Sequence, residues 1–491
     1  MVGTAHCAPG CGRTGIAEVR TRHRAHDPRG FRSRSRHGRN PMASMLEGCT
    51  PWPQAFVDRY WAAGHWGGST LDNLLRGWAL QYGPRTALVH GGTRLTYANL
   101  NRRVDRMAAG FRLRGLRPGM RVVVQLPNVP EFVVSTFALM RAGVVPVLCP
   151  VPYPEVPELV RVTQAVGYVG PAEYRGFDHT AMAADTAARW PFLRRVFTYE
   201  PPGTESPYGG LTTDPSNCQY APLGSLDAAP EPALPPDAGR VAFLLVDDDA
   251  DGADGGPVLV PRTHNDFAYQ ARAAAELVSL TEDDVYLAAL PAASVFTLGC
   301  PGIVGTLTAG GTVVLADGPD PAACLPLVER ERVTVTSLPP GAAAAWLDAL
   351  PSAGADVSSL RLVQTGGAPL PRAAAERLAS GLGARPQQVF APAGGPVVLT
   401  RPADPDETVY GTQGRPLSPD DEIRLVGADG RTVPDGEPGE LLARGPYTPR
   451  GRYRPAGDEA RRFTPDGFLR TGVLARRTAD GDLVVTGRAG D

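Results

Sequence analysis

Apolar and polar positions along the chain alternate between short buried runs and longer stretches with helical periodicity. Residues 121–126 (RVVVQL) form an apolar run typical of a buried strand, and Pro130 begins a helical pattern that ends before Gly143. Residues 144–148 predict the next strand. The same unit recurs later, with strands expected at 312–315, 333–338, 360–365 and 388–390 and helices at 323–332, 342–350 and 371–379. This alternation predicts an α/β fold in which helices cover parallel sheets.

Two segments do not follow this alternation of strands and helices. Residues 201–240 contain nine prolines and five glycines, which predicts a loop or a joint between subdomains. After residue 402 the pattern is typical of a small antiparallel sheet or distorted β-barrel, with β-like pieces between turns rich in Asp, Gly and Pro at 422–426, 439–442 and 483–486. We therefore predict two α/β subdomains over 45–401 and a β-rich subdomain over 402–487.

The composition excludes several kinds of chemistry. All 49 basic residues of the 491-residue chain are arginines, so no lysine can serve as a phosphate ligand, a Schiff base or a general base. Residues 41–491 are mildly acidic, which argues against nucleic acid as a partner. Seven scattered cysteines indicate a reducing compartment and predict a cytoplasmic protein. No apolar run approaches 18 residues, so no membrane span is expected.

The first 44 residues differ from the rest of the chain. Residues 1–40 hold nine arginines against two acidic residues, with almost no apolar periodicity, which predicts a disordered extension. Three readings compete for it: a transit-like peptide, a nucleic-acid-binding tail, or translated upstream sequence with the true start at Met42 or Met45. The last is favoured because compact-looking sequence begins at Met45.

Several motifs occur together in one order. They are PRTH at 261–264, QVF at 388–390, TQGRPLS at 412–418, RGPYT at 444–448, and DGF and RTG between 466 and 472. With these motifs the chain resembles the adenylate-forming (AMP-binding) enzymes. Within them it is similar to the stand-alone aryl-acid–AMP ligases, which activate 2,3-dihydroxybenzoate or salicylate for siderophore or nonribosomal peptide assembly. The resemblance extends from Met45 to Asp491.

The resemblance implies a fold, a reaction and a set of site residues. Members of this family join a carboxylate to ATP with the help of Mg²⁺, and then pass the acyl group to a carrier protein. The implied nucleotide pocket consists of Gly366, Gly367, Ala368, Val389, Phe390 and Arg488. The implied acyl pocket includes Ser294, Val295 and Phe296, where the first two replace a His-Asn pair of the family. His264 of the PRTH motif is expected to have a structural role at a strand–helix junction.

Five positions depart from the family pattern. The family's phosphate loop carries two hydroxyl side chains and a lysine, and the corresponding residues here are Ala253, Asp254 and Val258. Five aspartates between 247 and 254 make this loop acidic, so we expect it to repel phosphate. Gly394 stands in place of the family's Mg²⁺-binding carboxylate, which leaves no expected metal ligand there. Val473 stands in place of the aspartate that binds the ribose hydroxyls.

The end of the sequence adds a further expectation. Residues 488–491 correspond to the family's hinge, so the mobile C-terminal subdomain with its catalytic lysine is expected to be absent. Taken together, these departures predict a catalytically impaired homologue with a binding, scaffolding or regulatory role beside an assembly line. Two alternatives stay open: an active ligase completed by a separate C-terminal chain, and a truncated gene remnant.

Overall fold

A nine-stranded sheet lies at the centre of one half of the molecule. This computed structural model describes residues 45–204, 206–247, 256–455 and 462–489, so the predicted extension 1–44 lies outside it. The sheet is parallel from β17 to β1 and antiparallel at both edges. Its strands follow the order β19 (Arg415–Pro416), β18 (Val398–Leu399), β17 (Arg385–Phe390), β16 (Leu362–Thr365), β15 (Val335–Leu338), β13 (Val285–Ala288), β14 (Thr312–Leu315), β1 (Thr86–His90) and β2 (Thr93–Thr96).

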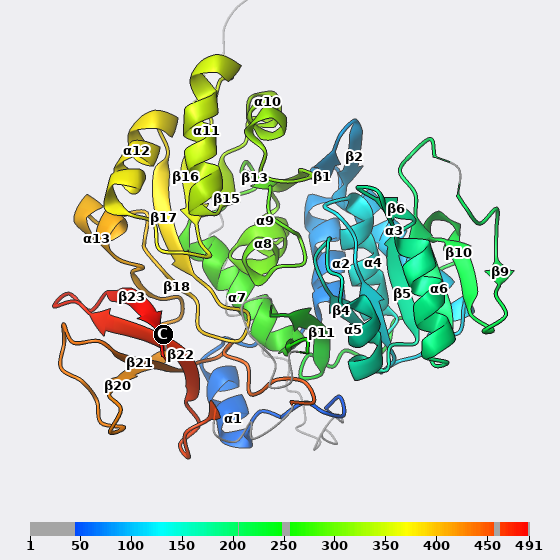
Figure 1. Cartoon of the computed structure of the whole chain (residues 1–491), viewed down its shortest axis with the longest axis horizontal. Helices are drawn as coiled ribbons and strands as arrows, with labels where there is room; N and C mark the ends of the chain where they lie inside the picture. The colour runs from blue at the N-terminus through cyan, green and yellow to red at the C-terminus, as the bar shows by residue number, and fades with distance from the viewer. Residues whose placement is uncertain (1–44, 205, 248–255, 456–461, 490–491) are drawn as a thin grey trace, which may run out of the picture. The chain divides into compact units, whose positions relative to one another are not determined.

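A second, eight-stranded sheet forms the other α/β subdomain (Figure 1). Its order is β12 (Leu259–Thr263), β11 (Val241–Val246), β4 (Val145–Leu148), β3 (Arg121–Val124), β5 (Gly167–Pro171), β8 (Arg195–Tyr199), β10 (Gln219–Pro222) and β9 (Thr212–Thr213). β10 pairs in parallel with β8, so the expectation of a plain loop over 201–240 is wrong at these strands. Among the described residues of this segment, Pro222 is the one proline within a strand, at the end of β10, and the other prolines lie in turns and loops.

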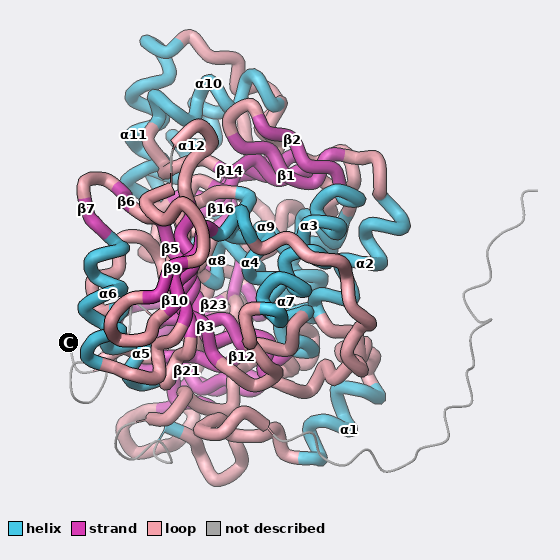
Figure 2. The backbone as a smooth tube through the Cα atoms, turned by 90° about the vertical axis from the view of Figure 1, so that its right-hand side faces the viewer, coloured by secondary structure: helices cyan, strands magenta, loops and turns pink. Residues whose placement is uncertain are grey.

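Helices fill the space between the two sheets and cover their outer faces. α2 (Leu71–Tyr82), α3 (Tyr97–Leu113), α4 (Pro130–Arg141), α7 (His264–Leu277) and α9 (Gly302–Ala309) share one core with both sheets. α10 (Pro321–Glu331), α11 (Pro340–Ala353) and α12 (Arg372–Leu382) cover the nine-stranded sheet. α5 (Val156–Thr163) and α6 (His179–Arg189) cover the eight-stranded one (Figure 2).

The alternation of side chains along β3 explains how one strand serves two of these layers. Val122 and Val124 belong to the core between the sheets, whereas Val123 belongs to the core beneath α5 and α6. Successive strand residues point to opposite faces, so a strand covered on both sides is apolar throughout. The unbroken apolar run that predicted this strand is therefore a direct consequence of its two-sided burial.

The third part is a four-stranded antiparallel sheet in chain order. It consists of β20 (Glu422–Val426), β21 (Gly439–Arg444), β22 (Leu469–Arg477) and β23 (Leu483–Arg488). Among the described residues β20 and β23 are its two edges, so the strands form the small antiparallel sheet that was expected as the alternative to a distorted β-barrel. β19 pairs with β18 in the nine-stranded sheet although it follows residue 402. The predicted subdomain boundaries themselves stay a prediction.

Arginine side chains attach this small sheet to α1 (Gln54–Ala62) by stacking on aromatic rings. The Arg424 and Arg444 guanidinium carbons lie 3.9 and 4.4 Å from the ring centre of Phe468. Arg444 and Arg450 each lie 5.3 Å from the ring centre of Phe56 in α1. A planar guanidinium stacks on a ring in a way that an ammonium does not, so the arginine-only composition has a structural use here.

The first turn of α7 shows why the PRTH motif is retained. Thr263 and Asp266 form a reciprocal capping box, and Arg262 forms a buried ion pair with Asp266 at 2.8 Å. The backbone N–H of Leu71 donates to His264 Nδ1 at 3.1 Å. This contact confirms the structural role expected for His264.

Among the described residues, no helix is both long and apolar enough to cross a bilayer.

A buried carboxyl group precedes β20 and predicts a pH dependence of stability. The Ser418 N–H and the Tyr447 hydroxyl donate to Asp421 Oδ2, while the buried Oδ1 accepts no hydrogen bond among the described residues. Burial raises the pKa of Asp421 to about 7. Protonation therefore favours the folded state, and this stabilisation is complete below about pH 4 and is lost as the pH rises through 7.

We compare the free energy of unfolding of the wild type with that of D421N. The difference, wild type minus D421N, should decrease as the pH rises from 4 to 7.5. The fall should be about 1–4 kcal/mol, at 1.4 kcal/mol for each unit of pKa difference. Urea denaturation at a series of pH values measures it. The exposed Asp356, whose pKa is lowered mainly by the Ser358 hydroxyl, supplies the control D356N, which should give a flat difference. A flat difference for D421N would contradict the assignment.

Candidate active site

The two ends of the predicted phosphate loop are held together by the β11–β12 hairpin. Val246 pairs with Leu259, and the Asp247 N–H donates to the Val258 carbonyl at 2.9 Å. The Val258 side chain is only 5% exposed, so the residue at the lysine position of the family is an interior apolar one. Ala253 and Asp254 lie outside the described residues.

Two neighbouring strands of the nine-stranded sheet end at the predicted nucleotide residues. Gly366, Gly367 and Ala368 follow β16, and Val389 and Phe390 end β17. The two strands are parallel, so both sets of residues meet at the carboxyl edge of the sheet, where open α/β sheets bind ligands. Gly367 has φ of +87°, a conformation that suits glycine and turns the chain across the end of the strand.

A pair of buried glutamines joins this edge to the small sheet. Gln413 Nε2 donates to Gln388 Oε1 at 2.9 Å, and Gln413 Oε1 accepts the backbone N–H of Val485 in β23 at 2.7 Å. Gln388 Oε1 also accepts the N–H of Leu370, at 3.2 Å. The amides thereby fix β23, and with it Arg488, against the loop that follows β16. Gln413 belongs to the TQGRPLS motif, whose side-chain partners the sequence alone did not indicate.

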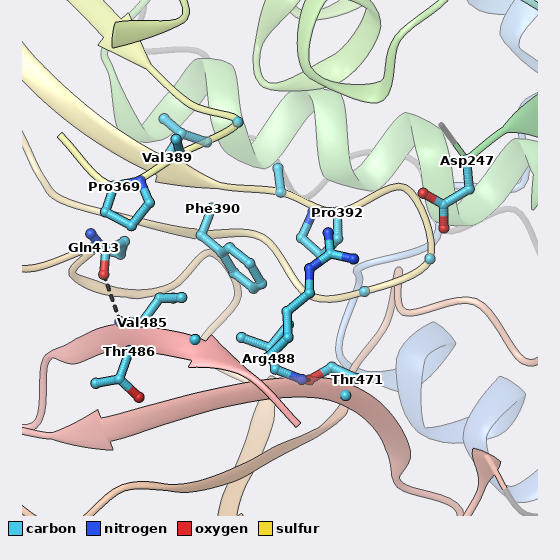
Figure 3. A pocket seen from close by; sticks show the side chains of 18 of the residues that line it. Asp247, Pro369, Val389, Phe390, Pro392, Gln413, Thr471, Val485, Thr486 and Arg488 are labelled. Carbon is cyan, nitrogen blue, oxygen red and sulfur yellow. Dashed lines mark hydrogen bonds between the residues drawn. The ribbon is translucent and has the colours of Figure 1, made fainter. Parts of the chain in front are cut away.

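A cavity of about 690 Å³ opens between these elements (Figure 3). Five of the six predicted nucleotide residues line it, namely Gly367, Ala368, Val389, Phe390 and Arg488. Gly394 and Val473, two of the predicted degenerate positions, line it as well, whereas Val258 does not. The structure thus brings together residues that lie more than 100 positions apart in the sequence, as the resemblance implied.

The predicted acyl residues lie outside the lining of this cavity. Ser294 caps α8 (Val295–Gly299) by accepting the Thr297 N–H at 3.2 Å, and Val295 belongs to the core between the two sheets. Phe296 packs against Gly366, since a Cβ atom on Gly366 would lie 2.8 Å from Phe296 Cε1. The Phe296 ring therefore packs directly against the backbone of Gly366. An acyl role for these three residues stays a prediction.

The charges around the cavity include several that the sequence did not single out. Arg452 and Arg462 line it together with Arg488, and Asp247 is the carboxylate among its lining residues. Figure 3 shows the Arg488 side chain extending from β23 toward Pro392, on the side of the cavity where Asp247 lies. The many arginines after residue 444 were a signal for such a cluster, but no spacing rule placed them at this cavity.

The residues near Gly394 decide whether a divalent cation fits. No group of three or more His, Cys, Asp or Glu that could hold a metal occurs in the described part of the chain. However, Asp247 Oδ2 lies 3.7 Å from the position that a Cβ atom on Gly394 would take. Mg²⁺ bound to nucleotides commonly uses only one or two protein carboxylates besides phosphate and water. Asp247 supplies one such carboxylate, so its chemistry fits a nucleotide-bound Mg²⁺, and the absence of a ligand at position 394 itself stays a prediction.

Comparison with known proteins gives the same class that the fold and the cavity define. The family model described as AMP-binding enzyme matches residues 75–453. The chain is 41% identical to the 2,3-dihydroxybenzoate-AMP ligase of Bacillus subtilis, over 91% of this chain and 80% of that protein. It is 43% identical to the salicyl-AMP ligase / salicyl-S-ArCP synthetase of Mycobacterium tuberculosis, over 92% and 79% of the two chains.

A solved structure supports the same assignment. The apo structure of Mycobacterium smegmatis MbtA superposes with a TM-score of 0.82 at 41% identity, covering 91% of this chain and 81% of that one. The chain therefore belongs to the family of AMP-binding enzymes, and its fold is that of the adenylate-forming enzymes. The resemblance to aryl-acid–AMP ligases drawn from the motifs is confirmed.

The contact between Gly366 and Phe296 predicts a coupled pair of mutations. A Cβ atom on Gly366 would also lie 3.0 Å from the Val389 carbonyl oxygen, so G366A should lower the free energy of unfolding by about 1–3 kcal/mol through overpacking. F296L should relieve part of this loss in the double mutant. Urea denaturation of the four variants of the cycle measures the coupling.

Gly367 provides the matched control for that cycle. A Cβ atom there would meet nothing within 4 Å, so G367A is strained only by its positive φ. Its cost should be about 1–2 kcal/mol and independent of F296L. Equal coupling of F296L to both glycine variants would show that Phe296 does not rest on Gly366.

Proposed function

We propose that this chain is a nucleotide-binding member of the AMP-binding family in which formation of an acyl-adenylate is impaired. Its role would be binding or regulation beside an aryl-acid assembly line for a siderophore or a nonribosomal peptide. One observation carries the proposal: the cavity keeps the residues expected to face the nucleotide, while the positions expected to perform chemistry are apolar or glycine. Gly367, Val389 and Arg488 represent the first group, and Gly394 and Val473 the second.

The shortage of cations at the reaction centre supports impairment. Adenylation brings an anionic carboxylate onto an anionic phosphate, and this encounter requires a positive charge that the site places in advance. Val258 replaces the lysine of the loop with a buried apolar side chain. Arginine does not reproduce that point charge, because its planar fork has a different reach and geometry.

The ribose end of the cavity supports the same conclusion. Val473 lines the cavity in β22, where the family's aspartate accepts hydrogen bonds from the ribose hydroxyls. Valine accepts none, and loss of a hydrogen bond from a site shaped for it commonly reduces discrimination by several kcal/mol. The nucleotide would therefore be held mainly by its base and phosphates. The base would lie against Gly367, Ala368 and Val389, and the phosphates would face the arginines of the lining.

Mg²⁺ would enter with the nucleotide, held by Asp247, and would offset the charge of the phosphates. The protein's own contribution is to exclude water from one face of the base and to orient the phosphates toward Arg488. The partners that suit this role are carrier proteins and biosynthetic enzymes of an assembly line. The described cysteines form no disulfide, which suits a reducing compartment.

A second candidate function is an active aryl-acid–AMP ligase. The identity of 41–43% to proteins named as ligases, over 79–80% of their length, favours it. The changes at Val258 and Val473 do not favour it, because the family has a lysine and a ribose-binding aspartate at these positions. Both candidates bind nucleotide, but only the second transfers it to a carboxylate.

Pyrophosphate exchange separates these candidates. We expect the protein to show no exchange above background with salicylate or 2,3-dihydroxybenzoate, while ATP and AMP each raise its melting temperature. The aryl acids alone should leave the melting temperature unchanged. The B. subtilis ligase, assayed in parallel, serves as the positive control. Exchange that depends on an aryl acid and approaches that of this control would refute the proposed impairment.

A further inference from the structure

We propose that Asp247 supplies, from the end of β11, the carboxylate that Gly394 lacks, and that it binds the divalent cation of an ATP held in the cavity. The proposal rests on the proposed nucleotide binding. On this proposal, the family's metal-binding carboxylate is missing at position 394 because another element of the fold, the end of β11, supplies it.

The geometry at Gly394 is the first support. A Cβ atom built there would lie 3.5 Å from Val260 Cγ2 and 3.7 Å from Asp247 Oδ2, which are ordinary van der Waals distances. Gly394 does not have a positive φ, so the backbone would accept a side chain. A glutamate at 394 would thus extend into the space that the Asp247 carboxylate reaches from the other wall.

The position of Asp247 is fixed by the sheet. It directly follows β11, which pairs with β12 on one side and with β4 on the other. Its N–H donates to the Val258 carbonyl at 2.9 Å, so the hairpin bond continues one residue past the strand. A ligand at the end of a strand paired on both sides is well positioned for a cation. The side chain lines the cavity together with Gly394 and Gly395.

The charges of the lining indicate which ligand suits this carboxylate. Asp247 faces the same cavity as Arg452, Arg462 and Arg488, which favour a polyphosphate. Without a cation, the carboxylate would repel that polyphosphate by on the order of 3 kcal/mol for each charge pair near 5 Å. A divalent cation shared between them turns the repulsion into attraction. ATP binding should therefore depend on Mg²⁺ through Asp247, whereas AMP, which carries less charge, should bind without it.

The experiment compares the affinity of the non-hydrolysable analogue α,β-methylene-ATP with and without Mg²⁺ by isothermal titration calorimetry. The variants are the wild type, D247N, and D247N/G394E, in which the carboxylate returns to position 394. D480N is the control, because it removes the same charge from an exposed turn outside the cavity lining. AMP without Mg²⁺ is titrated into every variant to show that the pocket is intact.

We expect Mg²⁺ to raise the affinity of the wild type and of D480N for the analogue by about tenfold or more, equivalent to about 1.4 kcal/mol. In D247N the enhancement should fall below about twofold, and D247N/G394E should recover it. AMP affinity should be the same in all four proteins.

Three results would overturn the proposal. If Mg²⁺ raises the affinity of D247N as much as that of the wild type, the assignment of Asp247 alone is overturned. The same follows if the Mg²⁺ enhancement does not return in D247N/G394E while AMP still binds. Absence of AMP and analogue binding by the wild type would overturn the proposed nucleotide binding and this proposal with it.

Discussion

The amide pair between Gln388 and Gln413 is the interaction on which the site depends. The small sheet shares an apolar cluster with Val398 of β18, and the cavity lies where β23 meets the carboxyl edge of β16 and β17. Gln413 makes this connection with both ends of its amide, to Gln388 and to the Val485 N–H. Because buried amides are costly to leave unpaired, the pair fixes one spacing between the sheets and so fixes where Arg488 enters the cavity.

The absence of lysine has a different meaning at the surface and in the site. Between α1 and the small sheet, arginines such as Arg444 stack on Phe468 and Phe56, an arrangement for which the guanidinium is well suited. In the site, the lysine position is the buried Val258. The cavity lining carries three arginines, and under the proposed function these arginines hold a phosphate without activating it.

Much of the fold could be predicted because its signals are local. The apolar run at β3 and the pattern from Pro130 to Gly143 at α4 each indicate a buried element from the sequence of one segment. The strand β10 was missed because the sequence around it is rich in proline, and a sheet was hard to tell from a distorted barrel because the pairing of edge strands leaves no local trace. In the site, Gly394 was recognised by its motif, but its closeness to Asp247 depends on how β11 and the loop after β17 meet.

The central claim is that the cavity binds a nucleotide but does not join it to an aryl acid. A crystal structure grown with ATP, Mg²⁺ and salicylate tests it most directly, because substrate and product differ at the α-phosphate. The account predicts unreacted nucleotide, with its base against Gly367 and Val389 and its phosphates beside Arg488 and Asp247. Density for salicyl-AMP continuing past Gly366 toward Phe296 would contradict it.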